Sequence, residues 1–493
     1  MPSSLQRTKG ALRSPDFRRL LVMRIVSTVG DGLFQASLIT SLVFSPDEQT
    51  TTEGFALASL VIVLPFSVIG PFAGVFIDRW PRRRILIVGP LLRAAIVGLV
   101  LFNAGDAPVL FYGGALWVLS VNRFYLTTAN AVVPRLVPTE DLLIANSLAT
   151  IGGTTALIAG AFAGGLVADA FGTVPLIVGC AVVWLAASVL AWRIHSDLRP
   201  HMLPESPELL RHALRRVAVE FGDGVRQLVH TPRALGPITS MGIDQLCQGL
   251  ILVLSLFVFR DRFQEGVGSF SYLIGAGGLG VFAGLVTVGK LEERFEKEQI
   301  IAGSFLLSGV TLLAIAPLIG PWTVLIASFF VGLSFAWKKI PADTLVQESV
   351  PDGYRGRIFA AYDVVYQGAR LFAAALAIPM LPGLGEAWSV TAVAVILLLW
   401  APVLPRWLAH VPELRLVFAA GSGPGAEPIA VVWGGVEEPV HVVRSWDEER
   451  AGTQMTCLRL DLEDGTRIDV SRRGDEEVWR LDRELDPDVP LVG

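Results

Sequence analysis

Charged residues are scarce in this chain of 493 residues: 17% are Asp, Glu, Lys or Arg, against about 25% in an average soluble domain. Cysteine is scarcer still, with Cys180, Cys247 and Cys457 far apart in sequence. A disulfide framework or a cysteine-based metal site is therefore not expected. The N-terminus is polar and basic and leads straight into an apolar segment, which does not match a cleavable signal peptide. A hydrophobic content of 52% and a mean hydropathy of +0.57 instead indicate a membrane protein.

The net charge of −5 conceals two regions of opposite sign. Residues 411–493 carry 18 acidic and 9 basic side chains, whereas the preceding part carries 27 acidic and 31 basic ones. The basic residues of the first part lie in scattered loops and not on one face, so nucleic-acid binding is not expected. These charges predict a basic membrane body followed by an acidic soluble tail.

Twelve apolar segments follow one another, each of roughly 20 residues, the length that crosses a bilayer as a helix. They predict an all-α membrane protein with twelve transmembrane helices. The segments are residues 18–44, 54–77, 85–103, 109–132, 147–168, 172–193, 234–259, 268–289, 299–317, 320–341, 358–381 and 386–408. The abundance of glycine, 49 residues, is typical of closely packed membrane helices.

Arginine and lysine gather in every second loop, including the residues before 18, the loop 78–84 and the long segment 194–233. The intervening loops lack both residue types, except for Arg260 and Arg262. Basic loops stay on the cytoplasmic side of a membrane. We therefore expect a multi-pass protein of the cell (plasma or inner) membrane, with both termini and the segment 194–233 in the cytoplasm.

One basic loop has a distinctive sequence, Gly70 to Arg84, in which an apolar run ends in one acid and a cluster of arginines. It resembles the loop between the second and third transmembrane helices of the major facilitator superfamily. The matching residues are Gly74, Asp78, Arg79, Arg82 and Arg83. Pro81 stands where that family prefers glycine, which changes the expected turn geometry. The resemblance implies a gating loop whose aspartate lies near the start of the eleventh segment.

Sequences in the first and second halves of the membrane region match at nearly one offset, 213 or 215 residues. The matches are Asp31–Gln35 with Asp244–Gln248, Val137–Pro138 with Val350–Pro351, and Gly74–Arg79 with Gly289–Arg294. Three such matches at equivalent places predict two six-helix repeats. Two six-helix repeats are also the architecture of the major facilitator superfamily.

Two of the matching residues, Asp31 and Asp244, are carboxylates inside predicted membrane segments. A carboxylate there is costly unless it is paired, solvated or protonated, and it can exchange protons near neutral pH. The resemblance places both beside a central cavity, where they would bind protons or substrate. Gln35 and Gln248 follow one helical turn later and are expected to bond substrate or the acid. The alternative is that each acid pairs with a nearby arginine, and that the glutamines only support packing.

Other charged residues also fall inside apolar segments. Arg123 lies where the family often has an arginine, and the resemblance implies proton relay or pairing with the loop aspartate; snorkelling to the membrane surface is the alternative. Lys338 and Lys339, near the end of the tenth segment, are expected to snorkel. Asp363 and Arg370 are seven residues apart and share a helix face, so we expect cavity contact or pairing across helices.

The fifth segment contains Gly160, Gly164 and Gly165, which resemble a glycine-rich pattern of the exporter branch of the family, with Ala161 in place of its proline. That pattern favours antiporters over importers. Glycines four residues apart also let helices pack closely, which is the simpler explanation. Further sequences resemble a subgroup that contains bacterial siderophore and macrolide exporters. They are Ser14–Leu20 with Arg18 and Arg19, Val26–Gly32 with Gly30-Asp31-Gly32, Pro134–Pro138, Ala145–Ser147, Gln347–Pro351 and Arg355–Arg357.

The tail after Trp407 has no membrane-length apolar run. Five short runs with strand character and a hairpin signal at Glu463–Thr466 predict a small β-meander. His441, Asp447 and Ser471 show no catalytic spacing, so the tail is expected to be an accessory or partner-binding module. The expected domains are an N-terminal six-helix bundle (1–193), a cytoplasmic central loop (194–233), a C-terminal six-helix bundle (234–410), a linker (411–427) and a soluble β-rich domain (428–485).

The resemblance implies a secondary active transporter that works by alternating access. The expected function is proton-coupled export of small amphipathic molecules, such as drugs, siderophores or secondary metabolites. A nutrient importer or uniporter of the same fold is one alternative, and a membrane-anchored regulator acting through the tail is another. No cofactor and no enzymatic activity are expected. We expect a monomer whose partners are a small-molecule substrate, protons, the lipid bilayer and a cytoplasmic partner of the tail.

Overall fold

The computed structural model describes most of the chain. The described residues are 12–43, 80–103, 108–138, 142–195, 219, 222–226, 228–229, 231–350, 352–409, 414–418, 427–433, 436–450, 453–463, 467–473 and 479–485. The predicted membrane segment 54–77 lies outside these residues, as do Gly74, Asp78 and Arg79 of the predicted gating loop.

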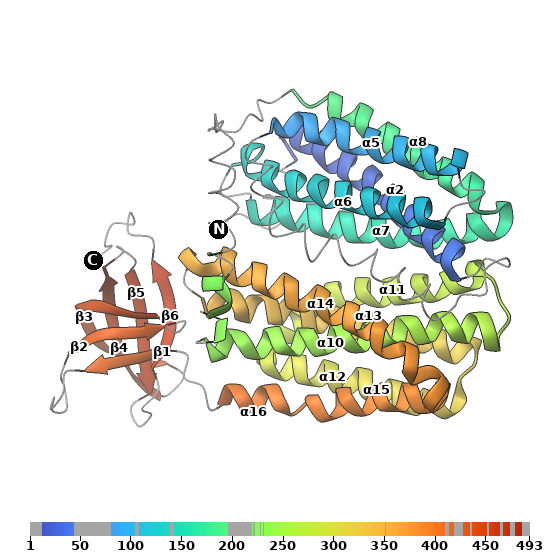
Figure 1. The fold of residues 1–493 in the computed structure, drawn as a ribbon. Coiled ribbons are helices and arrows are strands. Elements are labelled where there is room, and N and C mark those ends of the chain that lie inside the picture. Colours follow the sequence, from blue (N-terminus) through green and yellow to red (C-terminus); the bar gives the residue numbers. More distant parts are fainter. Residues whose placement is uncertain are drawn as a thin grey trace.

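Of the described residues up to 409, almost all lie in α-helices (Figure 1). They are α2 (Pro15–Val43), α5 (Arg82–Asn103), α6 (Pro108–Val132), α7 (Leu142–Phe171), α8 (Thr173–Trp192), α10 (Pro232–Phe257), α11 (Val267–Glu292), α12 (Lys297–Ile315), α13 (Pro321–Glu348), α14 (Asp352–Leu384), α15 (Glu386–Trp400) and α16 (Val403–Ala409). Short turns of other helix types extend three of them, at Val133–Arg135, Val258–Arg262 and Ala316–Leu318.

The helices form two groups that lie side by side (Figure 1). In the first group α2 packs on α7 and α8, and α5 packs on α6 and α8. In the second group α10 packs on α13, α14 and α15, and α12 packs on α13 and α15. The two groups meet along α7 and α11. The described helices therefore divide between two halves in chain order.

Among the described residues, eight helices are long and apolar enough to cross a membrane. The helices α2, α6 and α14 are also longer than 20 residues but are not among these eight, and each carries a charged side chain in its middle. Large apolar side chains point outward from the helices, including Trp322 (79% exposed), Phe171 (72%) and Trp388 (70%). Such exposure near helix ends is typical of aromatic side chains at a membrane surface. The total of twelve spans and the six-helix repeat stay predictions.

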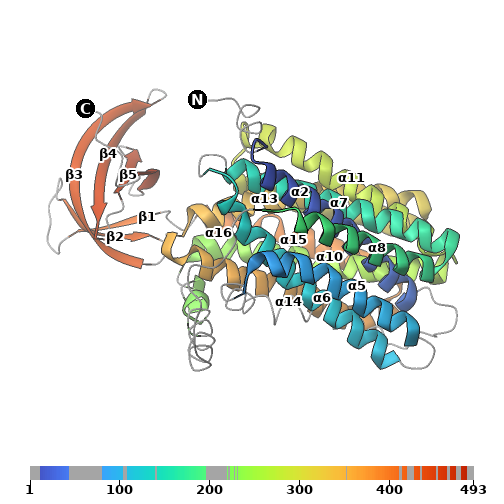
Figure 2. The ribbon, with the colours of Figure 1, turned by 90° about the horizontal axis from the view of Figure 1, so that it is seen from above.

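The tail forms one six-stranded antiparallel sheet with the strands in chain order (Figure 2). The strands are β1 (Leu414–Phe418), β2 (Pro428–Trp433), β3 (Val436–Arg450), β4 (Thr453–Leu462), β5 (Arg467–Arg473) and β6 (Arg480–Leu485). The predicted β-meander is therefore present, and the predicted hairpin falls between β4 and β5. Alternate residues of these strands, such as Leu458, Leu460 and Leu462, point into one apolar core.

The first strand of the sheet, β1, lies inside the range 411–427 that the sequence predicts as a linker. It pairs with β2 from Leu414 opposite Trp433 to Phe418 opposite Pro428. Leu416 of this strand is buried in the core of the sheet. The folded tail therefore starts close to the end of α16, before the glycine-rich stretch.

Candidate functional site

Asp31 of α2 is buried at the centre of the first half and is paired with Arg93 of α5. Arg93 Nη1 lies 2.5 Å from Asp31 Oδ1, and the two side chains are 0% and 5% exposed. The indole N–H of Trp184 on α8 also donates to Oδ1, at 3.0 Å. Among the described residues the second oxygen, Oδ2, has no hydrogen-bond partner. The pair joins three helices through one carboxylate oxygen.

Arg93 is held by several further contacts. It donates to Asn122 Oδ1 at 2.9 Å and to Ser27 Oγ at 2.8 Å. The rings of Tyr125 and Trp184 lie against its guanidinium, each with its centroid 4.8 Å from Cζ. These contacts replace much of the hydration that the cation loses on burial.

Asp244 of α10 has a corresponding partner in the second half, Lys338 of α13. Lys338 Nζ binds Asp244 Oδ1, and both side chains are 1% exposed. The same Nζ lies 3.3 Å from Ser308 Oγ and 4.7 Å from the centre of the Phe305 ring, both on α12. Gln245 donates to the other oxygen of Asp244 at 3.3 Å. A second buried ion pair thus joins α10, α12 and α13.

The expectation that Lys338 snorkels to the membrane surface is wrong. The sequence placed the end of its helix near residue 341, but α13 continues to Glu348. Lys338 therefore lies about 15 Å from the helix end at 1.5 Å per residue, and its amine is buried against Asp244 and does not extend to a surface. Its neighbour Lys339 binds the carboxylate of Asp343 one turn later.

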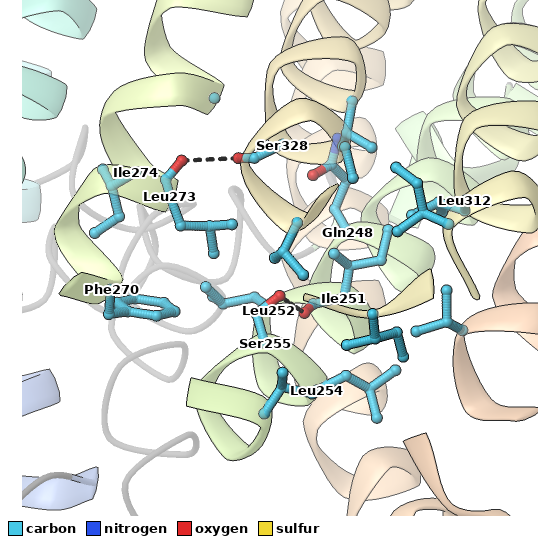
Figure 3. Close-up of a pocket in the computed structure, with 18 residues that line it drawn as sticks. Gln248, Ile251, Leu252, Leu254, Ser255, Phe270, Leu273, Ile274, Leu312 and Ser328 are labelled. Carbon is cyan, nitrogen blue, oxygen red and sulfur yellow. Dashed lines mark hydrogen bonds between the residues drawn. The ribbon is translucent and has the colours of Figure 1, made fainter. Parts of the chain in front are cut away.

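Gln248 lies one turn after Asp244 and lines a cavity of about 180 Å³ within the second half (Figure 3). Apolar side chains from α10, α11, α12, α13 and α15 form most of the walls. Two hydroxyl groups there are used internally: Ser328 donates to Leu273 O and Ser255 to Ile251 O. The amide of Gln248 makes no hydrogen bond to any described residue, so it is the polar group free to bind a ligand.

Gln35, the counterpart of Gln248 in the first half, is half-buried and makes no side-chain hydrogen bond to the described residues. It does not line the cavity that contains Gln248. The structure therefore places Gln248 at the cavity wall and Asp244 one helical turn before it, outside the lining residues, whereas Asp31 lies in a closely packed polar cluster.

Arg123 of α6 connects the two halves. Its Nη2 lies 2.6 Å from Oδ2 of Asp363 on α14, and the side chains are 23% and 35% exposed. The sequence expected one member of the Asp363 and Arg370 pair to bind across helices, and Asp363 does so. This contact is an ion pair that must break if α6 and α14 move apart.

The three glycines of α7 lie at helix contacts. A Cβ on Gly160 would come within 2.3 Å of Val29 O on α2, and one on Gly164 within 2.7 Å of the Ala36 Cβ. Gly165 faces the other way, and a Cβ there would come within 1.5 Å of Ser271 Oγ on α11. Because glycine has no side chain, α7 can pack closely on α2 in its own half and on α11 in the other half.

Two arginines of the predicted gating loop bind the ends of helices. Arg82 donates to Ala131 O at the end of α6, at 3.3 Å, and Arg83 donates to Trp192 O at the end of α8, at 2.9 Å. Carbonyl groups at a helix C-terminus lack intrahelical partners and carry partial negative charge. Within the described residues, these arginines therefore anchor the start of α5.

Sequence reasoning missed Arg93 and misread Lys338. The signal for Arg93 was available, because it is the single charged side chain in the middle of the segment 85–103. A buried cation inside a membrane segment needs a carboxylate partner. Among the described residues, no group of three or more His, Cys, Asp or Glu side chains could hold a metal ion.

Among the described residues, two groups of helices, eight of them long and apolar enough to cross a membrane, have the composition of a multi-pass membrane protein. The chain belongs to the Major Facilitator Superfamily, whose family model matches residues 20–374. The members of this family are transporters and not enzymes.

Curated relatives agree with this assignment. An uncharacterised MFS-type transporter of Mycobacterium tuberculosis is 31% identical over 392 residues, which is 76% of this chain and 86% of that protein. A Bacillus amyloliquefaciens protein named as a bacilysin exporter is 25% identical and covers 70% of this chain and 84% of its own. Macrolide efflux protein A of Streptococcus pyogenes is 28% identical, covering 66% and 81%.

Solved structures share the fold. A POT family transporter in complex with 5-aminolevulinic acid superposes with a TM-score of 0.64 and 12% identity, covering 79% of this chain and 95% of that one. At this identity the likeness concerns the fold alone.

Proposed function

We propose that this transporter exports small amphipathic molecules across the cell membrane in exchange for protons. The observation that carries the proposal is the similarity, over 70% and 66% of the chain, to two proteins named as exporters of bacilysin and of macrolides. Both names denote outward transport, one of bacilysin and the other of macrolides. The largely apolar cavity beside Gln248 is in keeping with an amphipathic substrate.

Buried carboxylates supply the groups for proton coupling. Asp31 lies in the 29-residue helix α2 and Asp244 in α10, which is apolar enough to cross a membrane. A charged acid inside a membrane is costly unless it is paired, solvated or protonated. Rocking of the two halves against each other would expose such groups first to one side of the membrane and then to the other. Arg123 and Asp363 hold the halves together on one side and would separate during that movement.

The proposal also includes the orientation of the protein in the membrane and a gate formed by the basic loop that contains Asp78. The distribution of basic loops favours cytoplasmic termini, with Asp78, Arg79, Arg82 and Arg83 on the cytoplasmic side. The three glycines of α7 would support sliding of α7 against its neighbours. The transporter would act as a monomer, with the tail sheet as a cytoplasmic accessory module.

Transport in everted membrane vesicles tests this function. In such vesicles an exporter moves substrate inward when the lumen is acidic, so a labelled macrolide should accumulate after a proton gradient is imposed. A protonophore should abolish the accumulation, and vesicles that lack the protein should show none. A panel of amphipathic antibiotics and peptides extends the test to other substrates.

An importer of the same fold gives the opposite result. Intact cells that express it would accumulate the labelled compound, and collapse of the proton gradient would lower the cellular content. An exporter in intact cells lowers the content, and collapse of the gradient raises it. Accumulation in intact cells that depends on the gradient would overturn the proposed direction.

A further inference from the structure

A groove runs along the outer surface of the first helical half, between α5 and α6. Its volume is about 380 Å³. Trp80, Arg84, Val88 and Leu92 line it from the side of α5, and Val121 and Phe124 line it from α6. Residues four apart lie on one face of a helix, so the groove follows the axis of α5.

The groove has the depth of one leaflet of a lipid bilayer. The helix α5 begins at Arg82 and is long and apolar enough to cross a membrane. Leu92, at the far end of the groove, lies about 15 Å along the axis from Arg82, at 1.5 Å per residue. Half of the hydrocarbon core of a bilayer is also about 15 Å thick. The groove therefore extends from one membrane surface to near the bilayer centre.

The two ends of the groove differ in chemistry. At the membrane surface lie Trp80, which is 55% exposed, and the exposed side chain of Arg84. Farther in, the walls are apolar, and Val88 and Leu92 face outward with 52% and 43% exposure. Tryptophan is typical of the membrane surface, where its ring contacts both lipid chains and headgroups. The groove is thus charged at the surface and apolar below it.

The three consecutive arginines at the start of α5 have different partners. Arg82 donates to Ala131 O and Arg83 to Trp192 O, at the ends of α6 and α8. Within the part of the chain that the structure describes, the side chain of Arg84 makes neither a hydrogen bond nor an ion pair. Its guanidinium is therefore available to a ligand at the end of the groove.

A glycerophospholipid combines the two chemistries that this groove accepts. A guanidinium binds phosphate oxygens through two parallel hydrogen bonds, and an apolar groove of leaflet depth accommodates an acyl chain. None of the described residues that line the groove is acidic, so the ammonium of a zwitterionic headgroup has no counter-charge there. The neighbouring Arg82 and Arg83 add positive charge. The site therefore favours an anionic headgroup.

We propose that this groove is a binding site for an anionic glycerophospholipid such as phosphatidylglycerol. The phosphate binds Arg84, the headgroup contacts the indole of Trp80, and one acyl chain lies between α5 and α6. The bound lipid holds the start of α5 against α6. The inference takes from the proposed function only the cytoplasmic orientation of this surface, and lipid binding does not depend on export.

A second groove in the same protein provides an internal control. It lies between α7 and α11, has a volume of about 480 Å³, and is lined by exposed apolar side chains such as Leu279 and Phe282. None of the described residues that line it is charged. This groove should therefore accept an acyl chain without selecting a headgroup.

Photolabelling of the full chain in phosphatidylcholine vesicles measures the selection. The vesicles contain a trace of phosphatidylglycerol with a diazirine in one acyl chain, or phosphatidylcholine with the same chain. After illumination, trypsin releases Ile85–Arg93 from the first groove and Phe263–Lys290 from the second. One arginine at a membrane surface favours an anionic lipid about fivefold. The ratio of phosphatidylglycerol to phosphatidylcholine label should be higher by that factor in Ile85–Arg93 than in Phe263–Lys290.

Substitutions identify the group that selects the headgroup. Arg84→Gln should lower the label ratio in the first groove to that of the second, whereas Arg84→Lys keeps the charge and should keep the preference. Arg193→Gln is the matched control. Arg193 is an exposed arginine at the end of α8, at the same membrane surface, and it does not line the groove. Its substitution should leave both ratios unchanged.

High salt gives a second test on the wild type, which does not depend on the folding of a variant. Salt screens exposed charges, so the preference for phosphatidylglycerol should fall. Equal ratios in the two peptides would show boundary lipid alone and overturn the inference. A preference that survives Arg84→Gln or high salt, or that Arg193→Gln abolishes, would also overturn it. Because labelling needs no transport, failure of the proposed export would leave this result unaffected.

Discussion

Arg123 Nη2 and Asp363 Oδ2 lie 2.6 Å apart and connect α6 of the first helical half to α14 of the second. Both side chains are partly exposed, so the ion pair contributes no more than about 1 kcal/mol. A contact of that strength can bias the equilibrium between two arrangements of the halves without preventing their exchange.

Arg123→Gln should therefore shift the protein toward the arrangement in which α6 and α14 are apart, by up to about fivefold in population. Spin labels on the two helices would report the change as a longer distance distribution. Arg262→Gln is the matched control, because it breaks an exposed ion pair with Glu386 inside the second half. An unchanged distribution in Arg123→Gln would mean that the pair does not hold the halves together.

Asp31→Asn should strongly destabilise the protein, by about 3–5 kcal/mol, because it leaves the buried guanidinium of Arg93 without a counter-charge. Unfolding of the purified protein in denaturant would measure the loss. Asp31→Asn combined with Arg93→Met should recover much of the stability, since it removes both charges. Equal stability of the single variant and the wild type would show that the pair is not a structural element.

Gly160→Ala should destabilise the contact between α2 and α7 by about 1–3 kcal/mol. The added Cβ would lie within 2.3 Å of the carbonyl oxygen of Val29, and neither backbone can move without disturbing the helix. Gly179→Ala is the control, because no atom lies within 4 Å of a Cβ at that position. Thermal unfolding of the two variants should differ clearly, with Gly179→Ala close to the wild type or above it.

Two truncations of the tail that end at nearby positions should have opposite results. A chain that ends at His410 loses the whole sheet and should insert and transport normally. A chain that ends at Phe418 keeps β1 without its partner β2, and an unpaired strand promotes aggregation. Gel filtration in detergent would detect the difference. Loss of transport in the shorter chain would instead assign the sheet a direct part in transport.

Acid should weaken the tail sheet through Asp461. Its carboxylate accepts from Arg467 Nε at 2.6 Å on the neighbouring strand, and this bond holds the pKa of Asp461 below its usual value, against the opposing effect of burial. The stabilisation is thus present above the unfolded pKa of about 3.9 and is lost as pH falls through the lower folded pKa.

Hydrogen exchange of peptides from β4 and β5 in the full-length protein should show this loss of protection in acid. The protection factor of each peptide corrects for the intrinsic pH dependence of amide exchange. Arg467→Gln should remove the difference between the protection factors at neutral and at acidic pH. A variant with the same pH dependence as the wild type would show that the Asp461–Arg467 contact is not the source of the acid sensitivity.

The family, the membrane character and the β-meander could all be predicted from the sequence. Apolar segments of membrane length, basic loops and alternating strand residues are local signals, and each is a direct consequence of burial in lipid or in a sheet core. The positions of Asp31 and Asp244 inside helices followed from the same local reading.

The sequence also indicated that these carboxylates are paired, solvated or protonated, because an unpaired charge in an apolar interior is too costly. It did not determine which partners they have. Arg93 is 62 residues from Asp31, and Arg123 is 240 residues from Asp363. Pairing at such separations depends on how each helix is rotated and how deeply it sits against its neighbours. Only the packing of whole helices decides these, so the tertiary structure alone assigned Arg93 to Asp31, Lys338 to Asp244 and the inter-half contact to Arg123.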